Sequence, residues 1–316
     1  MCKSRIQSSP AFSILMWFDI ILLFLHAHCH EYLLDIFLMK DKLISYDDIR
    51  KLSPIFRGRF GDFFIKKALK LSGLDKVNKV YDASKQYEGV EFCRHLLADV
   101  GVNIVVENIE VLDRFKNQAF ITVSNHAYGH IDGIAAIGTV GAVRDDYKMM
   151  VNFILGLIDT MSMNFITVNP YSSGKLKDVS SLEGVKKCIE HIKEGHPLGF
   201  FPAGAVSKTK IKRFKLEVED REWQPTVVKL IKRAKVPVIP MYFSGKNSWF
   251  FNFLDLIDWR LRTFRLGHEV YNKRGKTIYI RFGEPIMPEE QRNYDDLKEF
   301  GKFLKAKTYL LAKPTD

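Results

Sequence analysis

The stretch SNHAYGHIDG, residues 124–133, places two histidines and an aspartate within ten residues, directly after a short apolar run. A histidine titrates near neutral pH and can take a proton from a hydroxyl group, while a carboxylate can hold the imidazole in the required tautomer. Five residues separate His126 from Asp132, and Gly129 and Gly133 ease a turn that brings the two side chains together. The spacing therefore predicts a general base, His126, oriented by Asp132.

Two other interpretations of the same residues remain open. His126, His130 and Asp132 could bind a metal ion, because histidines four positions apart share one face of a helix. A hydrolytic metal site usually takes further ligands from other loops, and His196 lies at the start of a predicted strand, away from the expected rim. The third interpretation is a polar loop without chemistry. We favour the base and expect no metal.

The elements that must position these residues alternate from about residue 102 onward between β-branched runs and amphipathic segments. The expected strands lie near residues 102–109, 120–125, 147–155, 164–169, 198–204, 236–245 and 277–286. The expected helices lie near 89–100, from 131 onward, 179–194, 225–234, 248–264 and 289–311. This order predicts an α/β fold with a mostly parallel or mixed central sheet covered by helices.

Ligands of such sheets bind at the carboxyl ends of the strands. Three unusual loops follow predicted strands, at residues 124–133, 169–175 and 202–210. We therefore expect these loops to meet on one rim of the sheet.

The domain boundaries follow from composition. Residues 1–38 contain an apolar run, 11–25, which is shorter than the roughly 18–20 residues of a spanning helix. We predict an apolar extension or anchor at 1–38, an N-terminal helical, membrane-associating segment at 39–75, and one α/β domain at 76–316. Met39 reads like an ordinary start, so a chain that begins there is expected to keep its activity.

Composition narrows the classes of partner. The 316 residues carry a formal net charge of +11, which favours polyanionic partners. We find no zinc finger, no RNP1-like segment and no basic region running into heptads, so we expect no nucleic acid. The four cysteines are widely separated and form no C-x-x-C pair, which argues against a zinc ribbon or a disulfide framework. Anionic lipid is the expected partner.

Three segments in this order, SNHAYGHIDG, FPAG and VPVIPMYFSG, resemble the glycerolipid acyltransferase family, which includes lysophospholipid and 1-acyl-glycerol-3-phosphate acyltransferases. The five-residue spacing is similar to that of the bacterial hemolysin-like subgroup, and the resemblance covers roughly residues 90–290. It implies that His126 is the catalytic base and Asp132 its partner. The remaining implied residues bind substrate: Asn125, Gly133, Pro202, Gly204, Ser207 and Lys208.

The sequence departs from the family pattern at two places. Ala203 stands where the family commonly has a glutamate, and Asn169 and Pro170 stand where an arginine commonly grips the acceptor phosphate. Lys175 or the basic run 208–215 could replace that arginine. The acceptor is therefore expected to be lysophosphatidate-like or a hydroxyl on an N-acylated amino acid.

The resemblance implies an O-acyltransferase of membrane lipid synthesis that uses acyl-CoA or an acyl carrier protein as donor and needs no cofactor. We expect a peripheral protein on the cytoplasmic face of the membrane, docked through aromatic and basic helices near 60–71 and 249–265; buried core is the alternative for the second helix. A metal-dependent hydrolase and a non-catalytic lipid-binding protein are the competing functions.

Overall fold

The computed structural model describes residues 61–314, apart from 153–154, 156–157, 169–178, 213–214, 258–261 and 263–264. The predicted extension 1–38, the possible start at Met39 and the loop 169–175 lie outside the described residues.

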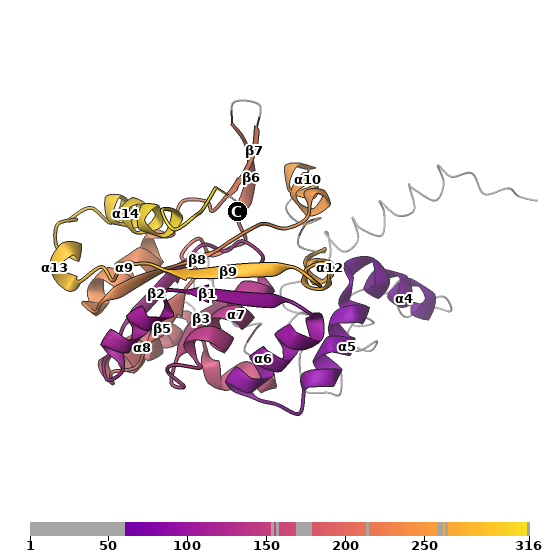
Figure 1. Cartoon of the computed structure of the whole chain (residues 1–316), viewed down its shortest axis with the longest axis horizontal. Helices are drawn as coiled ribbons and strands as arrows, with labels where there is room; N and C mark the ends of the chain where they lie inside the picture. The colour runs from indigo at the N-terminus through magenta and orange to yellow at the C-terminus, as the bar shows by residue number, and fades with distance from the viewer. Residues whose placement is uncertain are drawn as a thin grey trace, which may run out of the picture.

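A seven-stranded sheet runs through the centre of the molecule in the order β1-β9-β8-β2-β5-β3-β4 (Figure 1). Its strands are β1 (Asn103–Glu107), β2 (Ile121–Ser124), β3 (Lys148–Asn152), β4 (Phe165–Val168), β5 (Leu198–Phe200), β8 (Val238–Phe243) and β9 (Thr277–Phe282). Strand β8 pairs antiparallel with β9, and every other pair is parallel. The predicted α/β fold with a mostly parallel or mixed sheet is confirmed.

Helices cover both faces of this sheet, because successive side chains of each strand point to opposite faces. In β8, for example, Ile239, Met241 and Phe243 join one hydrophobic cluster with residues of α6 (Gly89–Val100) and α7 (His130–Val140). Val238 of the same strand joins the other cluster. That cluster contains residues of α8 (Val179–Lys193), α9 (Pro225–Ala234) and α14 (Leu297–Tyr309).

A two-stranded antiparallel hairpin, β6 (Lys208–Lys212) and β7 (Lys215–Glu219), projects from the end of the molecule that also carries α10 (Trp249–Ile257) (Figure 1). A loop was predicted for this basic run, and that prediction is wrong because the run forms a hairpin. Lysines alternate there with threonine and isoleucine, which is the period-two pattern of a strand.

One other predicted helix is divided in the structure, and a second is described only in part. The predicted final helix 289–311 consists of α13 (Pro288–Gln291) and α14, because Asp296 caps α14 by accepting hydrogen bonds from the backbone N of Lys298 and Glu299. Of the predicted helix 248–264, the structure describes α10 (Trp249–Ile257), and residues 258–261 and 263–264 lie outside the described residues. A short helix, α12 (Leu266–Tyr271), follows later in the chain.

The N-terminal helical segment contains α4 (Gly61–Ser72) as expected, and a second helix, α5 (Leu74–Ser84), follows at once. Gly73 lies between them with φ 79°, a left-handed conformation that ends one helix and lets the next begin. The predicted domain boundary between residues 75 and 76 falls inside α5. The remaining described helices are η3 (Ile109–Phe115) and η5 (Asp159–Asn164).

Candidate active site

The loop between β2 and α7 carries the predicted dyad. Strand β2 ends at Ser124 and α7 begins at His130, with Gly129 between them at φ 95° and ψ −118°. Asp132 is the third residue of α7, and its Oδ2 accepts hydrogen bonds from the backbone N of Tyr128 (2.8 Å) and Gly129 (3.0 Å). A carboxylate here satisfies amides that a helix N-terminus leaves unpaired, and the helix dipole favours its charge.

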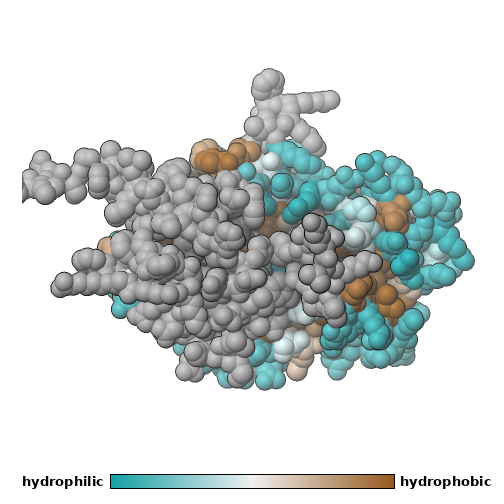
Figure 2. All heavy atoms as spheres, turned by 180° about the vertical axis from the view of Figure 1, so that it is seen from behind, coloured by the Kyte–Doolittle hydropathy of each residue, from teal (hydrophilic) through white to brown (hydrophobic). Residues whose placement is uncertain are grey.

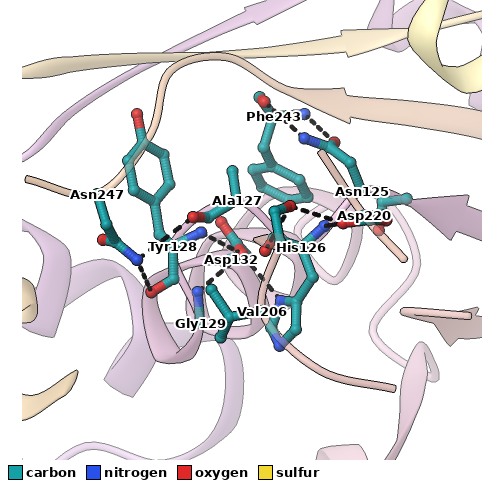
Figure 3. A network of polar contacts seen from close by, with 12 residues as sticks. Asn125, His126, Ala127, Tyr128, Gly129, Asp132, Val206, Asp220, Phe243 and Asn247 are labelled. Atoms are coloured by element: carbon teal, nitrogen blue, oxygen red, sulfur yellow. Dashed lines mark hydrogen bonds and ion pairs between the residues drawn. The ribbon is translucent and has the colours of Figure 1, made fainter. Parts of the chain in front are cut away.

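The imidazole of His126 completes this arrangement (Figure 3). Its Nδ1 lies 2.9 Å from the same Oδ2 of Asp132. The Asp132 side chain is fully buried, whereas 19 % of the His126 side chain is exposed. Among the described residues, Oδ1 of Asp132 accepts no hydrogen bond although it is buried. Two neutral backbone amides therefore hold the Asp132 carboxylate, and the imidazole of His126 is the side chain hydrogen-bonded to it.

The orientation of the imidazole is fixed on a second side by an aromatic ring. The rings of His126 and Phe201 stack with centroids 4.2 Å apart and 20° between their planes. With Nδ1–H donated to Asp132, Nε2 carries the lone pair that can accept a proton. The arrangement is that of a general base with its orienting carboxylate.

His130 does not share this arrangement, since it is the first residue of α7 and its side chain is exposed. In the described part of the chain, no group of three or more histidine, cysteine, aspartate or glutamate side chains is placed to hold a metal ion. Nδ1 of His126 is hydrogen-bonded to Asp132, and the exposed His130 is not part of that pair.

Two asparagines hold the loop in place. Asn125 is buried, and its side-chain amide exchanges two hydrogen bonds with the backbone of Phe243 in β8, at 2.8 and 2.9 Å. Asn247 donates to the carbonyls of Ala127 (3.4 Å) and Tyr128 (3.3 Å). Asn125 was predicted to bind substrate, and the structure places it as a brace between the loop and the sheet.

The predicted loop 202–210 meets the dyad loop, as expected from the carboxyl ends of β2 and β5. Pro202 is buried, and Gly204 is exposed at φ 64°, where an added Cβ would lie 2.0 Å from Nε2 of Gln224. Gly133 is partly buried, and an added Cβ there would lie 4.0 Å from the ring of Phe201. These glycines shape the rim around the imidazole.

Ser207 and Lys208 have different surroundings. Ser207 is buried, and its backbone N donates to the carbonyl of His126 at 2.8 Å. Lys208 begins β6 and is exposed. Substrate binding by either residue stays a prediction, and the contacts of Ser207 are with the protein itself.

Sequence reasoning missed Asp220, which lies between β7 and α9. This buried aspartate accepts a hydrogen bond from the backbone N of His126 at 3.2 Å, and burial raises its pKa. Its neighbours in sequence, EVEDREW, read as an ordinary charged surface. The residue pair is 94 positions apart, so no local motif joins them.

A buried ion pair lies beneath the same loop. Nζ of Lys273 lies 2.9 Å from Glu269 and 5.0 Å from the ring centroid of Tyr128, with both charged side chains at most 2 % exposed. Burial lowers the pKa of Lys273, against the attraction of Glu269. Glu269 also binds the backbone N and the hydroxyl of Ser248, the residue before α10. Helices α10 and α12 are thereby tied together beside the site.

Comparison with known proteins identifies the class. A family model described as acyltransferase matches residues 50–316. The lyso-glycine lipid O-acyltransferase of Bacteroides thetaiotaomicron is 28 % identical over 253 residues, covering 77 % of this chain and 88 % of that protein. The protein of the same name from Phocaeicola vulgatus is 26 % identical over 288 residues, covering 86 % and 98 %. The solved structure of the 1-acyl-sn-glycerophosphate acyltransferase from Thermotoga maritima aligns with a TM-score of 0.46 and 16 % identity over 82 % of this chain and 89 % of that one.

The family model covers both the N-terminal helices and the whole α/β region, and the dyad loop lies inside it. The chain is an acyltransferase. It belongs to the glycerolipid acyltransferase family.

Proposed function

We propose that this protein moves a fatty acyl group from an acyl thioester to the hydroxyl group of a lysolipid, with His126 as the general base. The observation that carries the proposal is the dyad itself: an accessible imidazole whose Nδ1 is fixed by a fully buried carboxylate at 2.9 Å. A histidine so held is suited to take a proton from an unactivated hydroxyl near neutral pH.

The reaction proceeds in two proton transfers. Nε2 of His126 accepts the hydroxyl proton while the hydroxyl oxygen attacks the thioester carbonyl carbon. The tetrahedral intermediate collapses, the carbon–sulfur bond breaks, and the imidazolium returns its proton to the departing thiolate. Asp132 stabilises the imidazolium between these steps.

We propose an acceptor with a hydroxyl on an N-acylated amino acid, such as an acylated glycine. Two relatives named lyso-glycine lipid O-acyltransferases align with most of this chain. The sequence also lacks the arginine that commonly grips a phosphate in the second block, having Asn169 and Pro170 there. A lysophosphatidate-like acceptor is the competing candidate, and the basic residues of the β6–β7 hairpin favour it.

The donor is the thioester of coenzyme A or of an acyl carrier protein, and the chemistry at the carbonyl carbon is the same for both. No metal or other cofactor enters these steps. A metal-dependent hydrolase would need His126, His130 and Asp132 to bind one ion, and a lipid-binding protein would have no use for the oriented imidazole.

A membrane surface with anionic lipids is the proposed docking partner. The five exposed apolar side chains of α10 form what we name the α10 patch: Trp249, Phe250, Phe253, Leu256 and Ile257. Figure 2 shows a hydrophobic cluster at the corresponding upper edge of the molecule. Exposed aromatic rings next to the exposed Lys208 and Lys210 suit an interface between headgroups and acyl chains.

Hydrogen bonds connect α10 and the residues just before it to the dyad loop and to β6. Asn247, just before α10, holds the carbonyls of Ala127 and Tyr128, and Asp255 of α10 accepts from the backbone N of Thr209 in β6. Of the helices that the structure describes, none has both the length and the apolar character needed to cross a bilayer. We propose peripheral docking at the cytoplasmic face, where the donor thioesters are found.

The test is acyl transfer by the purified protein, followed by mass spectrometry of the lipids. Separate reactions pair acyl-CoA or acyl carrier protein thioester with N-acyl-glycine bearing a hydroxyl, or with lysophosphatidate. We expect a diacylated product from the N-acyl-glycine acceptor that depends on His126 and persists in a chelator. Hydrolysis without acyl transfer, abolished by the chelator, would establish the metal-dependent hydrolase instead.

A further inference from the structure

We propose that Asp220 is a positioning residue that, together with Ser207, holds the backbone of His126 in place. The proposal rests on the catalytic role of His126 put forward above. It assigns a function to two buried residues that lie far from the dyad in sequence.

Both backbone polar groups of His126 are clamped. Its N–H donates to Oδ1 of Asp220 at 3.2 Å, and its carbonyl accepts from the backbone N of Ser207 at 2.8 Å. Oγ of Ser207 lies 2.6 Å from the same Oδ1 of Asp220 and 3.1 Å from the His126 carbonyl, and its single proton favours the shorter contact. Asp220 and Ser207 therefore act as one unit on the catalytic residue.

Asp220 is itself fixed from the other side. Its Oδ2 accepts from Nε1 of Trp223 at 3.1 Å, its backbone N donates to the Tyr309 hydroxyl at 2.8 Å, and its carbonyl accepts from Nζ of Lys305 at 2.6 Å. All three partners of the carboxylate are donors: the His126 amide, the Ser207 hydroxyl and the Trp223 indole. Such a set of donors satisfies an ionised carboxylate.

The neighbours of His126 show why this clamp matters. The side chain of Asn125 is bound to Phe243, and the amides of Tyr128 and Gly129 are bound to Asp132. His126 lies between these anchors, past the last residue of β2. Its own backbone is held from outside the loop, and a displacement of about 1 Å at a reacting group can cost about 10²-fold in rate.

The carboxylate of Asp220 also lies close to the imidazole, and its ionised form attracts a positive charge on His126. In the part of the chain that the structure describes, the titratable groups that interact with His126 include Asp132 and His130 of α7 and Asp220 after β7. Lys305 of α14 binds the carbonyl of Asp220, and Lys273 interacts with Asp132. Loss of the Asp220 charge should make the imidazolium less stable.

The experiment compares Asp220→Asn with Glu222→Gln, an exposed carboxylate two residues away. For Asp220→Asn we expect kcat to fall by about tenfold to a hundredfold, with KM within about twofold of the native value. The acid limb of the kcat profile should move to lower pH, because less negative charge faces the imidazolium. Glu222→Gln should change neither. A purely structural role would lower the melting temperature and the active fraction and leave the pH profile in place.

Ser207→Ala is the second variant, and it keeps the test valid if Asp220→Asn does not fold. It keeps the backbone bond to His126 and removes only the hydroxyl, so we expect a smaller fall in kcat, about threefold to tenfold, without a change in melting temperature. Full kcat in a folded Ser207→Ala protein, or an unshifted profile in a folded Asp220→Asn protein, would overturn the proposal. His126→Ala distinguishes failure of the proposed base from failure of the positioning role. If that variant keeps its activity, His126 is not the base, and the proposal for Asp220 and Ser207 fails with it.

Discussion

The described residues include two histidine–aspartate pairs, which lie at opposite ends of one sheet. In the first, Nδ1 of His126 lies 2.9 Å from Oδ2 of Asp132, and in the second, Nδ1 of His196 lies 2.5 Å from Oδ2 of Asp146. Judged by distance, the second pair is the tighter one. The surroundings of the two carboxylates differ, and that difference distinguishes the proposed base from a structural contact.

The carboxylate of Asp132 is fully buried and receives backbone amides, with no cationic side chain bound to it among the described residues. Asp146 accepts hydrogen bonds from Nε and Nη2 of Arg144, at 2.8 and 2.7 Å. The guanidinium of Arg144 by itself compensates the charge of Asp146. His196 adds one hydrogen bond to this ion pair.

The pairs also differ in their place along the strands. His126 follows the carboxyl end of β2, whereas Asp146 and His196 precede the amino ends of β3 and β5. Arg144 further binds the carbonyls of Phe115 and Gly195, so the second pair joins loops at the far rim. Parallel sheets bind ligands at the carboxyl ends of strands, and the dyad is at that end.

The largest predicted effect belongs to the first pair. His126→Ala should abolish acyl transfer, and Asp132→Asn should lower kcat by about 10²–10⁴-fold, the range for loss of a general base or of the group that orients it. The measurement is product formation by mass spectrometry, with folding checked by circular dichroism. His130→Ala is the matched control, because the exposed imidazole of His130 lies next to the site. Equal damage from His130→Ala, with loss of activity in a chelator, would favour the metal site.

The second prediction concerns the surface near the dyad end. Trp249 and Phe253 stack at 5.3 Å in the α10 patch, and Trp249 is 69 % exposed. Replacing both with serine should weaken binding to anionic vesicles by at least about tenfold, since burying one such side chain is worth about 1.5–3 kcal/mol. Binding is measured by co-sedimentation, and higher salt should weaken the remaining attraction.

The control for this variant is Leu182→Ser, a similarly exposed apolar residue at 58 % on α8. It should leave vesicle binding unchanged, because α8 packs on β4 and β5 rather than beside the dyad loop. Loss of binding in both variants would mean that apolar surface anywhere on the protein drives adsorption, and the α10 patch would have no special role.

The sequence predicted the parts of this site that are local. His126 and Asp132 lie on one loop, and the apolar runs around it have the periods of a strand and a helix. Asp220 could not be found in this way, and Ser207 was predicted to bind substrate rather than the backbone of His126. Ser207 precedes β6 and Asp220 follows β7, so their contacts with His126 depend on how the base of the hairpin lies against the dyad loop. The fold was similarly predictable in its strands, whose apolar pattern is strong, and less so in α5 and the hairpin. In the sequence, Gly73 indicates only the end of a helix, and a run of lysines indicates a solvated loop.

The third prediction concerns the stability of the second pair. Burial would raise the pKa of Asp146, but hydrogen bonds from Arg144 and His196 outweigh it and hold the pKa below its ordinary value. A lowered folded-state pKa contributes stability above the unfolded pKa and loses it as the pH falls through the folded value. Asp146→Asn should therefore lower the free energy of unfolding by about 1–3 kcal/mol at pH 7, and by less below about pH 4.

Chemical denaturation at several pH values measures this difference, with the exposed Asp145→Asn as the matched control. Acyl transfer by the folded Asp146→Asn protein should equal that of the native protein. A destabilisation that stays constant down to pH 3 would show that the Asp146 charge is not the source of the effect.

The smallest expected effect is that of His196→Ala, and it tests the comparison most directly. The imidazole of His196 is 38 % exposed, and Asp146 keeps both bonds from Arg144 when the ring is removed. Solvent-exposed pairs contribute about 0–1 kcal/mol, so the free energy of unfolding should fall by less than about 1 kcal/mol. Acyl transfer should stay within about twofold of native, in contrast to His126→Ala, although both variants break a contact of the same kind. A loss of activity comparable to that of His126→Ala, in a protein with native stability, would show that the histidine at the amino ends of the strands takes part in the reaction. The environment of the carboxylate would then be no guide to which pair is catalytic.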